Sequence, residues 1–414
     1  MLSAFIDSPA RLRALQRAPG GAWLDGFARQ LAHDGYATIT ARRHLRAAEH
    51  FIAWTQRTHL AIEMVGPASL DHFRRHLSQC RCRPFGCSDR TSPYSVRLFI
   101  GYLGRAGTIP EPRVTPTVPV PPLLGAFRQW MHAQRGTQAS TLDNYAVHVD
   151  ALLRRVEGDP AAIDARTLRQ FVLDGHTTQG WAAAKKRTTA LRMFVRFLVI
   201  AGHSHEALIG AIPVLAHWRL AGLPRYFSTE EVGRIIASCD PRTPIGIRDR
   251  AILLLLARLG LRAGDIVGLQ RPDIDWTGAS LRVCGKGRRE ARLPLTEEVG
   301  HALVAYLTHA RPATSTAAVF VRQRAPFRAF RSHSAVSVIV AEAIRRAGVR
   351  RPSRGAAHLL RHSVASAMLR HGASLREVAA VLRHQSTTTT EIYAKVDVTA
   401  LRQIAQPWPE VAPC

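Results

Sequence analysis

The stretch HLLRHSVASAMLRHGASLREVAAVLRHQSTTTTEIY, from His358 to Tyr393, decides how the C-terminal half of the chain is interpreted. His358, Arg361 and His362 are spaced i, i+3 and i+4, so a helix would place all three on one face. Two imidazoles at i and i+4 can bind zinc, but Leu359 stands where an H-E-x-x-H site has its glutamate. An arginine between two histidines is better suited to a phosphate oxyanion, because a guanidinium keeps its charge and donates several hydrogen bonds.

Further basic motifs lie on both sides of this helix. GLRAGDIVGL contains Arg262, and SLRVCGKGRREARLPL has the alternation of a β-hairpin with Lys286 between two glycines at its tip. After the helix, an LRH motif ends at His384, and Tyr393 follows nine residues later.

In this order and at this spacing, the motifs resemble the tyrosine recombinase family, also called phage integrases, from about Ser228 to Tyr393. Arg262 with Asp265 fits the first motif and His358–His362 the second, while the third is matched by Leu382, His384, Thr388, Thr389 and Tyr393. The sequence departs from the family at two positions: Arg383 stands where many relatives have glycine, and Asp265 where many have glutamate.

The resemblance implies a site-specific recombinase, integrase or transposase that cuts and rejoins DNA through a 3′-phosphotyrosyl intermediate. The negative charge that develops on the phosphate calls for preorganised donors. The implied catalytic residues are the clamp Arg262 and Arg361, the phosphate donor His384, the nucleophile Tyr393, the proton acceptor His358 and the general acid Lys286. No metal or nucleotide cofactor is expected, and the sequence contains no G-x-x-x-x-G-K-[ST] loop.

Three rival functions remain open at this point. A type IB topoisomerase would use a similar set of residues to relax DNA, and a DNA-binding protein could have lost catalysis. A zinc nuclease could be built on His358 and His362. The role of Asp265 is also open, because it could orient the Arg262 guanidinium or cap the start of a helix.

Net charge points to a polyanionic partner. Lys and Arg number 57 against 30 Asp and Glu, a formal charge of +27, which favours nucleic acid over an anionic membrane surface, and the resemblance implies double-stranded DNA. The longest apolar run, Ala251 to Ala257, is far shorter than the roughly 20 residues of a membrane span. Without a secretion signal, we expect a bacterial cytoplasmic, nucleoid-associated protein. The resemblance implies a homo-oligomer, a tetrameric synapse on DNA, with other recombinases or accessory proteins as further partners.

Two linkers divide the chain. TIPEPRVTPTVPVPP at 108–122 is too rich in proline for a helix, and a looser linker spans 206–226. We therefore expect a helical module at 1–107, a helical module at 123–205, a catalytic domain at 227–396 and a tail at 397–414. RLFIGYLGRAG, which ends at Gly107, resembles RMFVRFLVIAG, which ends at Gly202, at a constant offset of 95 residues, so the modules are interpreted as duplicates.

The second module resembles the core-binding, SAM-like domain of the family. Its AAAKKRTTALR segment supplies the residues expected to contact the DNA backbone, namely Lys185, Lys186, Arg187 and Arg192. The fold expected overall is mainly α, with a small β-sheet in a recombinase-like α+β catalytic domain. Ser228 with Glu231 and Ser374 with Glu377 have the spacing of helix-starting capping boxes.

Cysteines cluster at one place in the first module. Cys80, Cys82 and Cys87 lie near His72 and His76, but C-x-C-x4-C matches no common zinc pattern. Whether this cluster binds zinc is left open by the sequence.

Overall fold

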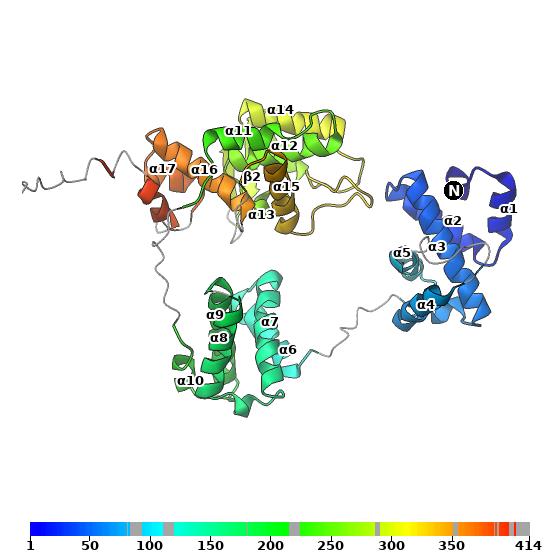
Figure 1. The fold of residues 1–414 in the computed structure, drawn as a ribbon, viewed down its shortest axis with the longest axis horizontal. Helices are drawn as coiled ribbons and strands as arrows, with labels where there is room; N and C mark the ends of the chain where they lie inside the picture. The colour runs from blue at the N-terminus through cyan, green and yellow to red at the C-terminus, as the bar shows by residue number, and fades with distance from the viewer. Residues whose placement is uncertain are drawn as a thin grey trace, which may run out of the picture. The chain divides into compact units, whose positions relative to one another are not determined.

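The computed structural model describes residues 1–80, 82, 93–110, 120–179, 181–214, 224–285, 290–350, 355–384, 386, 389–396 and 401–402 (Figure 1). The chain forms two compact units, Arg113–Ala221 and the combination of Met1–Pro112 with Gly222–Cys414. Among the described helices, none combines the length and apolar character needed to cross a bilayer.

The part of the chain expected to be catalytic is mainly helical and contains a small sheet, as predicted. Its elements are α11 (Thr229–Ala237), α12 (Pro244–Ala257), α13 (Ala263–Gly268), η4 (Arg271–Asp273), β1 (Ile274–Asp275), β2 (Ser280–Cys284), β3 (Glu290–Pro294), α14 (Glu297–Ala305), the π-helical turn η5 (Tyr306–Ala310), α15 (His333–Arg346), α16 (Ala356–Arg370), α17 (Leu375–Val381) and η7 (Glu391–Val396).

Helix α12 forms the centre of this core. Every residue from Ala251 to Leu256 is fully buried, and the helix contacts α11, α14, α15 and α16. An apolar surface on all sides is what a helix surrounded by other helices requires. The buried Arg248 near its start is paired with Asp249 at 2.7 Å, so this charge is compensated.

The sheet is antiparallel with strand order β1-β2-β3, which confirms the predicted hairpin. Leu281 on β2 pairs with Ile274 on β1 and with Leu293 on β3, and all three side chains are buried. Arg282 and Arg292 alternate with them and form ion pairs with acidic side chains. Lys286, at the expected hairpin tip, lies outside the described residues.

Both predicted capping boxes are present. The Ser228 amide donates to Glu231 at 2.8 Å and the Glu231 amide to the Ser228 hydroxyl at 3.1 Å, which fixes the start of α11. Ser374 and Glu377 form the same pair of hydrogen bonds at the start of α17.

The two N-terminal modules share one order of elements, and each has its own hydrophobic core. After η1 (Leu2–Ala4) and α1 (Pro9–Arg17), the first contains α2 (Gly21–His33), α3 (Thr38–Arg57), η2 (Ile62–Met64), α4 (Pro67–Gln79) and α5 (Pro93–Arg105). The second contains α6 (Pro122–Arg135), α7 (Ala139–Arg155), η3 (Pro160–Ala162), α8 (Ala165–Gln179) and α9 (Trp181–Ile200), and α10 (Ala207–Gly210) follows. Gly107 and Gly202 end α5 and α9 with positive φ angles of 71° and 77°.

Aromatic packing repeats between the modules. In the first, Phe27 meets Phe99 edge to face with ring centroids 5.2 Å apart, and in the second, Phe127 meets Phe194 in the same way at 5.4 Å. Phe99 and Phe194 are related by the 95-residue offset, and Phe27 and Phe127 come from the first helix of each set. The shared contact supports an origin by duplication.

Candidate active site

Tyr393 is buried at the C-terminal end of the described chain. It lies on η7 with 1% of its surface exposed and packs against Leu369, Val378 and Leu382. Its hydroxyl is 2.5 Å from Nδ1 of His362. Burial raises the pKa of Tyr393 to about 12 and lowers the pKa of His362 to about 4. At neutral pH a protonated phenol therefore faces a neutral imidazole, and the phenol donates to the ring nitrogen.

Arg361 joins three segments that are distant in the sequence. Its guanidinium, 4% exposed, donates to the backbone carbonyls of Gly260, before α13, and of Leu382, after α17. Gly260 has φ +59°, and a Cβ atom there would lie 2.7 Å from Leu382, so this approach requires glycine. Burial, together with Arg262 and Arg383, lowers the pKa of Arg361 to about 9, which leaves it protonated at neutral pH.

Arg262, Asp265 and Arg383 form a second connection between the first and third motifs. Arg262 donates to the Arg383 carbonyl at 3.1 Å, and Arg383 is paired with Asp265 at 2.6 Å. Asp265 also accepts from the Arg262 backbone amide at 2.9 Å, so it caps α13, one of its two expected roles. Arg383 has φ +53°, a conformation that glycine adopts without strain. The guanidinium at this position is paired with Asp265, while its buried Nε and Nη1 have no hydrogen-bond partner among the residues that the structure describes.

His384 lies beside Tyr393. Its ring is nearly parallel to that of Tyr393, with centroids 6.4 Å apart, and its Nδ1 is 2.7 Å from the hydroxyl of buried Thr390. Burial, Arg361 and Arg262 lower the pKa of His384 to about 4, so the ring is neutral. When Thr390 donates to Nδ1, the ring proton resides on Nε2, the tautomer that can donate to a phosphate oxygen.

The structure therefore brings Arg262, Arg361, His384 and Tyr393 into one region. One expectation from the sequence was wrong. His358 was expected to meet the phenol, but His362 contacts the Tyr393 hydroxyl. His358 is exposed and lies one helical turn before His362, and the centroids of these two imidazole rings are 6.3 Å apart. Both histidines lie in the quoted motif, but spacing does not show which one faces η7.

Comparison with known proteins places the chain in a family. A profile of the Phage integrase family matches residues 225–399. The putative integrase/recombinase y4rA of Sinorhizobium fredii is 36% identical over 412 residues, which cover 98% of each chain. The chain belongs to the phage integrase family. The integrase is also 31% identical to tyrosine recombinase XerC of Xylella fastidiosa, over 68% of this chain and 95% of XerC.

Solved structures share the integrase fold. A lambda integrase dimer bound to a COC′ core site matches with a TM-score of 0.53 and 19% identity, covering 70% of this chain and 98% of that chain. XerH recombinase bound to a palindromic difH substrate also matches with a TM-score of 0.53 and 19% identity, covering 68% and 83% of the respective chains. These likenesses show the mainly helical fold with its small sheet.

Two of the four basic residues expected to contact DNA make hydrogen bonds within the protein. Arg187 is 8% exposed, donates to the Phe171 carbonyl at 2.8 Å and stacks on the Phe171 ring, which ties α9 to α8. Arg192 donates to the Pro213 carbonyl at 3.1 Å and holds the segment after α10. Lys185 and Lys186 are exposed. A basic run on a helix has both a buried and an exposed side, and charge alone does not distinguish them.

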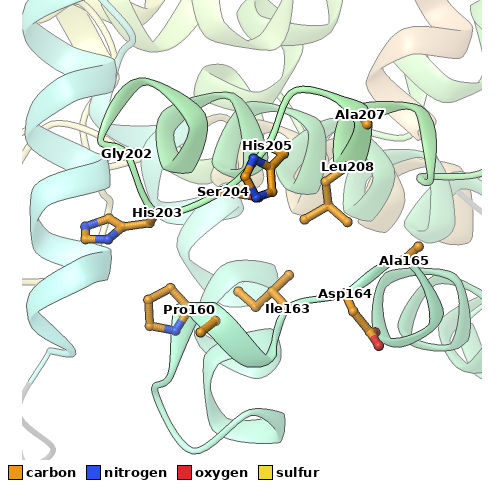
Figure 2. A pocket seen from close by; sticks show the side chains of 11 residues that line it. Pro160, Ile163, Asp164, Ala165, Gly202, His203, Ser204, His205, Ala207 and Leu208 are labelled. Carbon is orange, nitrogen blue, oxygen red and sulfur yellow. The ribbon is translucent and has the colours of Figure 1, made fainter.

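The second module of the integrase also contains a pocket (Figure 2). It lies between the turn after α9, with His203 and His205, and the η3 region, with Pro160 and Ile163. It includes none of the residues expected to be catalytic, so its position does not mark the active site.

We expect Arg187→Ala to destabilise the chain by about 1–3 kcal/mol, because it removes a buried guanidinium together with its hydrogen bond to the Phe171 carbonyl and its packing on the Phe171 ring. The matched change Lys186→Ala removes an exposed charge and should stay within about 0.5 kcal/mol of wild type. Urea denaturation of the full chain, followed by circular dichroism, measures both. Unchanged stability of Arg187→Ala would contradict its structural role.

Proposed function

We propose that this integrase breaks and rejoins DNA strands with Tyr393 as the nucleophile. The phenolic oxygen attacks a phosphodiester, a 3′-phosphotyrosyl bond forms, and the 5′ oxygen leaves as a hydroxyl after taking up a proton. Attack by the 5′ hydroxyl of a partner strand then reverses these steps and releases the tyrosine. The observation that carries the proposal is the buried Tyr393 hydroxyl in contact with His362, in a region with an excess of positive charge.

The cationic groups are suited to bind the scissile phosphate. Burial and the neighbouring guanidinium groups lower the pKa of Arg361 and of Arg262, and Asp265 is the carboxylate that contacts Arg383. A phosphate anion would offset the positive charge of the arginines that Asp265 leaves uncompensated. During attack on the phosphodiester, negative charge builds up on the phosphate oxygens, so the arginines would stabilise the transition state more than the ground state. Arg262 and Arg361 would bind the non-bridging oxygens, with His384 as a further donor.

Two residues would move the protons. His362 would accept the proton of Tyr393, because a phenol with a pKa of about 12 does not ionise by itself at neutral pH. His358, exposed on the same helix face, is left as a phosphate or DNA contact. Lys286 remains the proposed acid for the leaving 5′ oxygen, on the basis of its place between two glycines in the sequence.

Duplex DNA is the proposed partner. Lambda integrase and XerH were solved bound to DNA, and lambda integrase as a dimer and as a tetramer on a Holliday junction, so we propose a homo-oligomer on DNA here too. The first module would be a duplicate of the core-binding domain, and Lys185 and Lys186 would contact the phosphate backbone. The setting would be the nucleoid in the cytoplasm of a bacterium.

A suicide substrate carrying the cognate site should trap a covalent adduct with wild type and none with Tyr393→Phe, which retains the ring and loses only the nucleophilic oxygen. Tyr226→Phe removes a partly exposed hydroxyl elsewhere and should leave trapping intact. Denaturing gel electrophoresis in the presence of EDTA detects the adduct. An adduct in Tyr393→Phe would falsify the proposal.

Replacing His362 should change how the cleavage rate depends on pH. With neutral His362 as acceptor, the wild-type single-turnover rate should be nearly constant from about pH 6 to 8, since the pKa of His362 is about 4 and that of Arg361 about 9. In His362→Gln the phenol must lose its proton to solvent, so the rate should fall by roughly 10²–10⁴ at pH 7 and then rise about tenfold per pH unit. His371→Gln, at an exposed position beyond the same helix, is the control. Equal pH profiles for wild type and His362→Gln would exclude this role.

Loss of Lys186 should weaken duplex binding through the phosphate backbone. The slope of log K against log salt should decrease by about 0.9 in Lys186→Ala if one phosphate contact is lost. Fluorescence anisotropy with labelled duplex measures this slope, and an unchanged slope would place Lys186 away from DNA.

A further inference from the structure

The first module gathers ligand-type side chains that the proposed recombination chemistry does not use. His50 comes from the middle of α3, His76 from the last turn of α4, and Cys80 and Cys82 from the residues that follow α4. One ligand atom from each side chain lies within 4.8 Å of the corresponding atoms of the other three. We call these four residues the Cys2His2 cluster.

The spacing of the ligand atoms fits a tetrahedral metal. Cys80 Sγ is 3.5 Å from His50 Nε2, and Cys82 Sγ is 3.5 Å from His76 Nε2. In a zinc tetrahedron with bonds of about 2.3 Å to sulfur and about 2.0 Å to nitrogen, neighbouring sulfur and nitrogen atoms are about 3.5 Å apart. A zinc ion could therefore sit among these atoms without a large rearrangement of the chain.

The surroundings of the cluster are dry and support thiolate ligands. His50 is fully buried, and Cys80 and Cys82 are 4% and 8% exposed. The rings of Phe73 and Trp54 pack against the two histidines. The backbone amide of Cys82 donates to Cys80 Sγ at 3.3 Å, the kind of outer hydrogen bond that stabilises a metal-bound thiolate.

We propose that the Cys2His2 cluster is a structural zinc site of the first module. Four protein ligands leave no open position, so the metal would stabilise the fold and would not take part in the reaction. It would fix the end of α4 to the middle of α3. The second module contains no cysteine, so the site would distinguish the N-terminal copy from its duplicate.

The full set of four ligands could not be recognised from the sequence, for a physical reason. His50 lies 30 residues before Cys80, and only the packing of α3 against the segment after α4 brings it to the cysteines. His72, which is closer in sequence, is not part of the cluster. Cys87 lies outside the described residues.

The test measures metal content and does not depend on DNA cleavage. The full chain, purified under reducing conditions without chelator and reconstituted with Zn²⁺, should retain about one zinc per chain by elemental analysis. Reconstitution with Co²⁺ should give the visible bands of tetrahedral cobalt with a thiolate charge-transfer band. Zinc lost from wild type only when a mercurial reagent titrates its thiols would support the cluster.

Variants identify the ligands. Cys80→Ser and Cys82→Ser should each weaken zinc binding at least tenfold, while Cys284→Ser, an exposed thiol on β2, and Cys87→Ser should retain it. Because ligand loss could unfold the module, His76→Cys provides a second test: it should still bind one metal, with a stronger thiolate band in the Co²⁺ spectrum. Failure of reduced wild type to hold Zn²⁺, or retention of zinc in both Cys80→Ser and Cys82→Ser, would overturn the proposal. Loss of zinc in Cys87→Ser with retention in Cys82→Ser would also overturn it.

Discussion

The buried guanidinium of Arg361 is the contact on which the active site depends. Its hydrogen bonds to the carbonyls of Gly260 and Leu382 connect α16 to the segment before α13 and to the segment after α17. Burying the Arg361 guanidinium, which is 4% exposed, costs free energy unless its N–H groups have hydrogen-bond acceptors. The two carbonyls must therefore stay in place for α16 to stay buried. The same contact positions Arg262 and His384, which adjoin the two carbonyl segments. The structure of the site and the phosphate binding proposed for it therefore depend on one side chain.

The surroundings of Tyr393 follow from the same burial. Burial raises the pKa of the phenol to about 12 and, with neighbouring charges, keeps His362 and His384 neutral, so the Tyr393 hydroxyl stays protonated at neutral pH. Low dielectric also strengthens the attraction between the arginines and an incoming anion. In the free protein, this arrangement would keep the Tyr393 hydroxyl buried and protonated. With DNA bound, it would stabilise the negative charge that forms on the phosphate during attack.

Much of this was predictable from short-range patterns. The spacing of His358, Arg361 and His362 predicted one helical face, the alternation from Ser280 to Leu295 predicted the hairpin, and serine–glutamate pairs predicted two helix starts. Contacts across the fold were not predictable in this way. Spacing could not tell whether His358 or His362 faces Tyr393, or that Arg187 turns inward to Phe171 while Lys186 faces outward.

By itself, the sequence determined the helical character, the hairpin, the repeated modules and the motifs that place the chain among phage integrases, because each depends on residues close together in the chain. Only the tertiary structure decided which imidazole meets the phenol, that Asp265 caps α13 and pairs with Arg383, and that His50 reaches Cys80. Apart from the local cap, these are contacts between segments 30 to 118 residues apart, set by how helices pack, and packing direction is not encoded in local spacing.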